Sequence, residues 1–360
     1  MVEKFAKCTV KFDWNTVLGF GCVVTDDANP PTISFNTHKY TLGMVERFLK
    51  GENKPNMTAP SRQSIMDLPA IELPPLGSPE DIAMKGMQDD CRALTGGLGH
   101  LARGRIDIVY EHNAGAQGMH RPTYEYFEAM KNALRYSWAH VDEAHVHSIQ
   151  KCMEVSPSRE PIRPYDEDVE YGLYGIKDAN YAKPGDAVYN SKSTGAYAVM
   201  LGAAAVDWKS WRFHSVVTDT TSAESQAGSR LSARMVYFRA ICQFTGIAQG
   251  HKPSPTFTDN DGLWYQAKDA ADAVKMAFVI RHVRFIQQAQ EMKLTRYFQI
   301  DGLLNPVDPL TKWKDTLSKK RDFLFLMGKP HLARKVWRES KAFQAFKPKK
   351  IVPVSPLEHD

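Results

Sequence analysis

The chain has 360 residues, of which 43% are hydrophobic and 24% are charged, and its formal net charge is +5. This length and composition allow one large or two medium-sized globular domains and exclude a low-complexity chain. The longest nearly apolar stretch, AYAVMLGAAAV at 196–206, is shorter than the roughly 20 residues of a membrane span. The opening MVEKFAKCTVKFDW lacks the apolar core of a signal peptide, so we expect no membrane partner.

The cysteines indicate the compartment. There are five of them, widely scattered and without the spacing of a zinc site: Cys8, Cys22, Cys91, Cys152 and Cys242. This usage is typical of free thiols in a reducing environment. We therefore expect an intracellular protein, nuclear or cytoplasmic.

The positive charge is concentrated near the C-terminus. Residues 313–350 hold nine lysines and three arginines against three acids, whereas residues 1–312 are slightly acidic. Aromatic residues are interleaved with these cations, a composition that could follow a phosphate backbone. A solvated or partly disordered extension is an equally good interpretation.

The first half of the chain is predicted to be strands followed by helices. Strands are expected before residue 25 and in TISFNTHKY, which leads into a helix at LGMVERFLKG, and a Pro-rich linker is expected at 54–81. In TYEYFEAMKNALRYSW the apolar residues Phe127, Met130, Leu134 and Trp138 fall on one helical face. The glycines of LTGGLGHLARG indicate close packing or a helix break, since no phosphate-loop lysine follows.

The segment HVDEAHVHS at 140–148 allows two interpretations. Its three histidines and two acids are zinc-ligand types, but their spacing does not fit a compact helical site. A polar helix end or loop is the better prediction.

Beyond an irregular passage at 156–168, the pattern changes to alternating strands and helices. YGLYGIKD is a strand, AYAVML and AAVDWKS form a hairpin, and TFTD and LTRYFQI are two further strands. Helices are predicted at SAESQAGSRLSARMVYFRAICQF and DAADAVKMAFVIRHVRFIQQAQ. Hairpin and crossover connections together predict an α/β fold with a mixed sheet.

Four acids lie at the ends of these elements. Asp178 ends the first strand, Glu224 is expected in the first turn of the next helix, Asp259 ends a later strand, and Asp308 follows the last one. Each has a simpler interpretation. Asp178 and Asp259 suit strand-end turns, Glu224 suits a capping box with Thr221, and Asp308 suits a helix cap.

Convergence of these acids would have a chemical meaning. Carboxylates crowded together raise one another's pKa unless cations are present, and Mg²⁺ is the cation that best fits carboxylates plus phosphate. Two such ions about 4 Å apart stabilise the attacking and leaving oxygens of a phosphodiester displacement. In TDND, Asp259 is then the expected ligand and Asp261 the residue that shapes the turn.

Several blocks around these acids resemble the ribonuclease H domain of copia-type retrotransposon polyproteins. They are KDANYA, SKSTGAYAVMLGAAAVDWKS, TTSAESQAG, FTDNDGLWYQAK and NPVDPLTKW. Upstream, TISFNTHKYTLGMVERFL, KPNMTAPS and CRALTGGLGHLARGRIDIVYEHN resemble the reverse transcriptase thumb and the connecting segment. The resemblance covers about residues 15–313, so the basic segment lies outside it.

The resemblance implies an architecture. Residues 165–315 would form a ribonuclease H-like mixed five-stranded sheet with flanking helices. A mainly helical module would precede it, with 1–60 as palm end and thumb, 61–155 as linker and connection, and 316–360 as a basic tail.

The resemblance also implies an activity. Asp178, Glu224, Asp259 and Asp308 would be the metal-binding catalytic acids of an enzyme that cuts the RNA strand of an RNA–DNA hybrid. Two Mg²⁺ ions, with Mn²⁺ able to substitute, would be the cofactors. Lys192, Lys209 and the basic tail would contact the nucleic-acid backbone. The acid order Asp, Glu, Asp, Asp separates this family from transposase and integrase relatives, in which the glutamate comes last.

The sequence departs from the family pattern in three ways. It contains no Tyr-x-Asp-Asp palm motif, so we expect no DNA synthesis and a fragment, truncated element or host-retained remnant. Asn180 stands where the family usually has a second Asp, and RHVRFIQQ matches only loosely. An inactive remnant that binds nucleic acid without cutting it is the alternative function.

Overall fold

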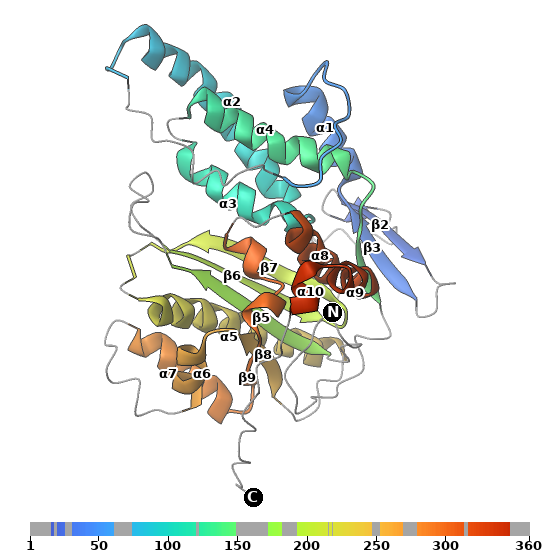
Figure 1. Cartoon of the computed structure of the whole chain (residues 1–360), viewed down its shortest axis with the longest axis vertical. Coiled ribbons are helices and arrows are strands. Elements are labelled where there is room, and N and C mark those ends of the chain that lie inside the picture. Colours follow the sequence, from blue (N-terminus) through green and yellow to red (C-terminus); the bar gives the residue numbers. More distant parts are fainter. Residues whose placement is uncertain are drawn as a thin grey trace, which may run out of the picture.

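The computed structural model describes most of the chain in two connected parts, a helical part and a larger mixed sheet (Figure 1). The described residues are 16–17, 20–25, 31–60, 74–119, 122–148, 172–181, 193–214, 216–217, 219–246, 253–268, 279–312 and 316–345. The expected strand at CTVKFDW, the irregular passage at 156–168 and Lys192 lie outside them. Among the described residues, no helix combines the length and apolar character needed to cross a membrane.

The large sheet confirms the predicted mixed architecture. It has five strands in the order β7-β6-β5-β8-β9. β5 pairs antiparallel with β6, and β6 with β7, whereas β5–β8 and β8–β9 are parallel. The strands are β5 (Leu173–Asn180), β6 (Thr194–Leu201), β7 (Ala204–Arg212), β8 (Ser254–Thr258) and β9 (Thr295–Gln299).

The predicted hairpin forms because its turn contains a glycine in a left-handed conformation. Gly202, between β6 and β7, has φ +62°, which a side chain would disfavour. Its N–H donates to the carbonyl of Gly172 at 2.7 Å, next to the start of β5. The turn thus fixes the register of the three antiparallel strands.

One face of the sheet is covered by α5 (Thr220–Thr245), with α6 (Asp261–Lys268) and α7 (Ile280–Glu291) beside it. Of the predicted stripe on α5, Ala227, Leu231, Met235 and Cys242 are buried and Phe238 is half-buried. The helix ends at Gly246, whose φ of +76° suits a C-terminal glycine cap. The apolar spacing therefore identified the face that packs on the sheet.

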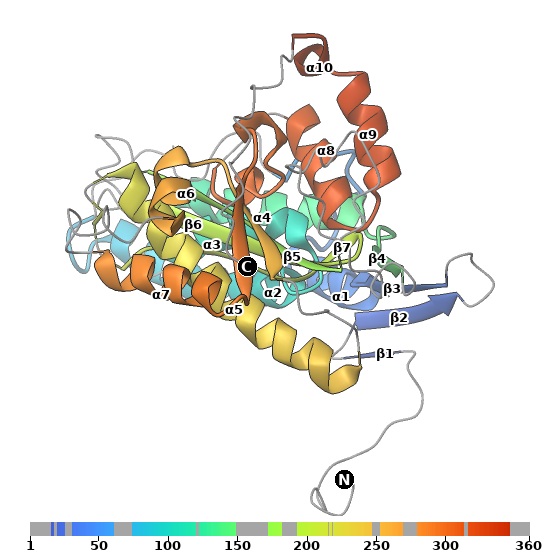
Figure 2. The same cartoon turned by 90° about the horizontal axis from the view of Figure 1, so that it is seen from below.

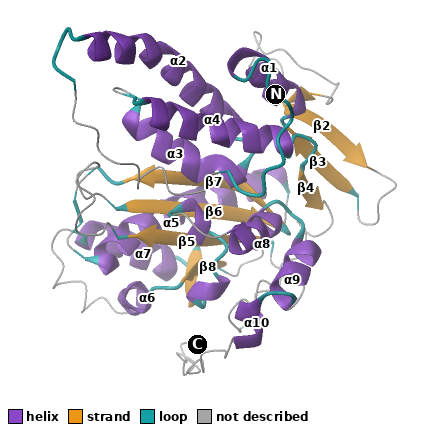
Figure 3. Cartoon of the chain, turned by 45° about the horizontal axis from the view of Figure 1, so that its top comes forward, coloured by secondary structure: helices purple, strands orange, loops and turns teal. Residues whose placement is uncertain are grey.

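The other face of the sheet packs against the helical part. Tyr174 and Ile176 of β5, which alternate with the α5-facing residues, join one core with the N-terminal helices. These helices are α1 (His38–Phe48), α2 (Pro79–Leu101), η3 (Ile106–Ile108), α3 (Val109–Gly118) and α4 (Tyr124–Ala139). Figure 3 shows them grouped above the large sheet.

The helical predictions hold with small changes. On α4, Phe127, Met130 and Leu134 are buried, whereas Trp138 is partly exposed. α2 continues through the glycine-rich stretch, which favours close packing over a helix break. A Cβ at Gly97 would lie 2.2 Å from Met44 Cε, so the glycine lets α1 and α2 approach.

A second sheet contains the segment HVDEAHVHS. Its order is β1-β2-β3-β4, from β1 (Thr16–Val17), β2 (Phe20–Thr25), β3 (Thr32–Asn36) and β4 (His145–Ser148). The expected polar loop is therefore wrong for 145–148, which pair antiparallel with β3. His145 is buried between the rings of His147 and Trp208, and burial lowers its pKa to about 3.

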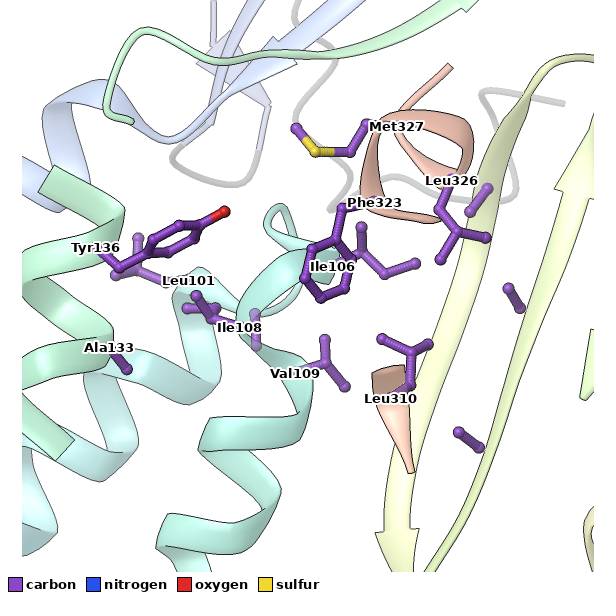
Figure 4. Close-up of a cluster of buried hydrophobic side chains, with 14 of the residues drawn as sticks. Leu101, Ile106, Ile108, Val109, Ala133, Tyr136, Leu310, Phe323, Leu326 and Met327 are labelled. Carbon is purple, nitrogen blue, oxygen red and sulfur yellow. The ribbon is translucent and has the colours of Figure 1, made fainter. Parts of the chain in front are cut away.

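The basic C-terminal segment is folded rather than solvated over its described part. It forms α8 (Thr316–Leu326), α9 (Pro330–Arg338) and α10 (Lys341–Ala345), on the side of the sheet opposite α5 (Figure 2). Phe323, Phe325 and Trp337 are buried in the main core. Figure 4 shows Phe323 and Leu326 close to Ile106. Three of the interleaved aromatics are thus core residues, which corrects the solvated-extension interpretation for 316–345.

Candidate metal centre

Two of the predicted acids are brought together by the parallel pairing of β5 and β8. Ile176 lies opposite Phe257, so the register places Asp178 of β5 level with Asp259, the first residue after β8. Parallel strands end at the same edge of a sheet, and both side chains therefore start from one rim. This arrangement matches the expectation for the two strand-end aspartates.

Glu224 reaches the same rim from α5. The helix is capped by Asp219, whose Oδ1 accepts a hydrogen bond from Ser222 N at 2.8 Å. Glu224 is consequently the fifth helical residue, with its side chain buried. The first-turn position predicted for Glu224 is wrong, and so is its alternative, a capping box with Thr221, because helix α5 begins at Thr220, two residues before the predicted start at Ser222.

Three acids converge. One carboxylate oxygen from each of Asp178, Glu224 and Asp259 lies within 4.8 Å of the others. Asp178 and Glu224 are buried, and Asp259 is half-buried. This is the only cluster of three or more metal-ligand side chains in the part of the chain that the structure describes.

Asp308 flanks the cluster without joining it. It begins the short helix η8 (Asp308–Leu310), is buried, and carries an ion pair from Lys312. Its charge is close enough to raise the pKa of Asp178. Asp308 lies outside the group of mutually close oxygens, so the structure brings together three of the four predicted acids and places the fourth beside them.

Neighbouring side chains orient the carboxylates. The hydroxyl of Thr311 donates to Asp178 Oδ2, and the ammonium of the completely buried Lys177 donates to Glu224 Oε2. The sequence prediction missed Lys177. Its only sequence signal is a cation directly before the predicted ligand Asp178.

The electrostatics of the site follow from burial and crowding. Burial and, after it, the charges of Asp259 and Asp308 together raise the pKa of Asp178 to about 8. Burial also lowers the pKa of Lys177 to about 8, although the charges of Asp259 and Asp178 oppose that shift. Without a cation, these groups are held in an unfavourable environment.

The TDND turn is shaped by its asparagine. Asn260 Oδ1 accepts from Leu263 N at 2.8 Å and so caps α6, while Asn260 N donates to Thr258 Oγ1 at 3.1 Å. Asp261 instead accepts a hydrogen bond from Gln299 Nε2 at 2.7 Å. The prediction that Asp261 shapes the turn is therefore wrong; Asn260 does so.

The residues present fit a hard divalent cation. Asp259 Oδ1 is buried and has no hydrogen-bond donor, which is costly unless a cation satisfies it. The three converging groups are all carboxylates, the ligands that Mg²⁺ and Mn²⁺ prefer. Asp178, Glu224 and Asp259 are thus the residues that could hold a metal.

Lys209, a predicted nucleic-acid contact, is exposed on β7. The register aligns it with Tyr197 and, through Tyr197, with Lys177. It therefore stands two strands, or about 10 Å, from β5. Its role stays a prediction.

Comparison with known proteins relates the chain to retroelements. No family model and no solved structure matches it. The chain is 26% identical over 221 residues to the retrovirus-related Pol polyprotein from transposon RE2 of Arabidopsis thaliana. It is 27% identical over the same length to the Pol polyprotein from transposon RE1 of the same plant. Each match covers 61% of this chain and 14% of the relative. The chain is thus similar to a small region of retrotransposon Pol polyproteins.

Proposed function

We propose that this chain is a retroelement-derived, metal-dependent ribonuclease H that cleaves the RNA strand of RNA–DNA hybrids. The observation that carries the proposal is the convergence of three carboxylates around the unpaired Oδ1 of Asp259. The mixed sheet is compatible with this activity, and the similarity to Pol polyproteins supports a nucleic-acid substrate.

The residues of the site have separate roles. Asp178 and Asp259 would be the principal ligands, with Thr311 orienting Asp178, and Glu224 would complete the acidic wall from α5. Asp308, held by Lys312, would extend that wall toward the substrate phosphate. When bound, divalent ions stabilise charge on the attacking and leaving oxygens of a phosphodiester displacement. No serine, cysteine or histidine nucleophile is needed.

The test is digestion of an RNA–DNA hybrid by the full chain with Mg²⁺ or Mn²⁺. The hybrid carries a label on its RNA strand, and matched double-stranded RNA and DNA serve as alternative substrates. Asp259→Asn should lower the cleavage rate by at least about a hundredfold, the usual loss when a group that stabilises transition-state charge is removed. Asp261→Asn is the matched control, because Asp261 lies two residues away and bonds Gln299 instead. Equal rates for wild type and Asp259→Asn would refute the proposal.

Binding without cleavage is a second candidate function, favoured by the exposed face of α9. His331, Lys335 and Arg338 recur at helical spacing on that face, while Ala333 and Trp337 are buried on the other. An open pocket of about 340 Å³ is lined by the same face: His331, Arg334, Lys335, Arg338 and Glu339. This exposed face, from His331 to Arg338, is called the α9 ridge below. It is about 10 Å long, enough for about three phosphates of one strand.

Contacts connect helix α9 to the acidic rim, the sheet edge where Asp178, Glu224 and Asp259 converge. Arg321 Nη2 donates to Leu303 O at 2.8 Å, and its guanidinium lies 4.9 Å from the ring centre of Trp337. A Cβ at Gly302, the residue before Leu303, would lie 3.5 Å from Asp259 Oδ2. The buried face of α9 is thus linked through Arg321 and residues 302–303 to the edge where Asp259 lies.

Charge reversal tests this candidate. Lys335→Glu with Arg338→Glu should weaken hybrid binding and lower the salt dependence of the binding constant by about two in slope, or about 0.9 for each lost phosphate contact. Lys39→Glu with Lys50→Glu is the control, an equal charge change on exposed lysines of α1 and its C-terminal end. Binding without cleavage is favoured if wild type binds the hybrid but yields no products with any divalent metal. The α9 variant, and not the control, should then show the smaller salt dependence of the binding constant.

A further inference from the structure

Lys177 places an ammonium group inside the acidic cluster. Its side chain is fully buried and its ammonium contacts Glu224 Oε2. Lys312, by contrast, pairs with the flanking Asp308 and is 44% exposed. Lys177 therefore lies within the group of carboxylates that could hold metal, whereas Lys312 lies at its border.

The backbone explains why Lys177 reaches Glu224. Side chains alternate along β5, and Gly175, two residues earlier, faces Leu231 and Met235 of α5. Lys177 therefore points to the α5 face, where Glu224 lies two turns before Leu231. Asn305 Nδ2 also holds the carbonyl of Lys177 at 3.1 Å, so the strand is fixed at this point.

The charge balance matches one dication rather than two. Asp178, Glu224, Asp259 and Asp308 carry four negative charges when ionised, and Lys177 and Lys312 return two positive charges. The remainder of two negative charges is neutralised by a single Mg²⁺ or Mn²⁺. A second dication would leave the buried site positive and would compete with Lys177 for Glu224.

We propose that Lys177 takes the place of one of two cations, so that this site binds a single divalent ion. Asp178 and Asp259 are its ligands, and Glu224 stays paired with Lys177. The inference rests on the proposed function only in using the same carboxylates for metal binding. It replaces the expected pair of Mg²⁺ ions by one ion and one ammonium group.

The test counts bound Mn²⁺ on the full chain by titration, with the free ion followed by electron paramagnetic resonance. Wild type should bind one ion, and Lys177→Met should gain a second site or at least tenfold tighter second binding. Lys312→Met is the matched control. It removes an equal charge but leaves Glu224 occupied, so it should bind one ion, more tightly than wild type. Two equal sites in wild type, or one site in Lys177→Met, would overturn the inference.

A further variant keeps the test decisive if Lys177→Met fails to fold. Lys177→Met with Glu224→Gln removes both partners of the buried pair, leaves no uncompensated charge, and should bind one ion as wild type does. A double variant that binds two ions contradicts the inference. Failure of the proposed function looks different, because then wild type and every variant bind no Mn²⁺ and cut no hybrid.

Discussion

Two buried aspartates of this chain respond to burial in opposite ways. Burial would raise the pKa of Asp107, but the charge and hydrogen bonds of Arg105 lower it instead. Asp178 is equally buried, and its pKa is raised because its nearest charged partners include Asp259 and Asp308. Burial alone thus does not decide the state of a carboxylate; the charge facing it does.

The environment of Asp107 shows what a structural charge needs. Arg105 donates to both of its oxygens, at 2.9 Å and 2.7 Å, and its third nitrogen donates to the carbonyl of His140 at 2.8 Å. Positive and negative charge are matched one to one. At the acidic rim, carboxylates outnumber ammonium groups and Asp259 Oδ1 has no donor. This difference separates a matched pair that holds the fold together from a group of unmatched carboxylates that could hold a cation.

The largest effect is expected from breaking the matched pair. Arg105→Met leaves the Asp107 carboxylate buried without a partner, which costs about 3–5 kcal/mol of unfolding free energy. Urea unfolding followed by circular dichroism measures the loss. Asp89→Asn, which removes an exposed 3.7 Å pair with Arg92, should change stability by less than about 0.5 kcal/mol. Similar losses in both variants would mean that the two kinds of pair do not differ.

At the acidic rim, removing a charged side chain should increase the unfolding free energy instead of lowering it. In EDTA, Asp178→Asn removes a crowded carboxylate and should raise the unfolding free energy by about 2 kcal/mol. The same variant should lose the stabilisation that Mn²⁺ gives to wild type. Asp261→Asn, outside the cluster, is the control for both measurements. A loss of stability in EDTA would show that Asp178 is a structural charge like Asp107.

A pH series sharpens the same comparison. The folded pKa of Asp178 lies near 8, above its ordinary value of 3.8, so between these values the folded state holds a proton that the unfolded state has released. Stability in EDTA should therefore fall as pH rises from about 4 to about 8. Asp178→Asn should flatten this decline. A decline of equal slope in the variant would assign the effect to other groups.

The sequence alone predicted most of the strands and helices of the large sheet and the three acids that converge, because strand alternation and helical spacing are local signals. It missed Lys177, since contact with Glu224 depends on which face of β5 each residue takes and on where α5 begins. β4 was missed because its partner β3 lies more than a hundred residues earlier. The burial of α8 and α9 was hidden by their cationic residues: Lys319 and Arg321 of α8 are themselves buried, and α9 carries its exposed charges on the face opposite the buried Trp337.

The smallest effect is expected from the neutral cap beside the site. Asn260→Ala removes the acceptor for Leu263 N, which costs about 1 kcal/mol of unfolding free energy and loosens the first turn of α6. Because Asp259 adjoins that turn, Mn²⁺ binding should weaken by a few-fold, measured by the same titration. Asn260→Ser keeps an acceptor at the cap position and should restore most of both values. If Asn260→Ala weakened metal binding as much as Asp259→Asn does, Asn260 would itself be a metal ligand. The distinction between a neutral residue that caps the helix and the charged residues that bind metal would then be wrong.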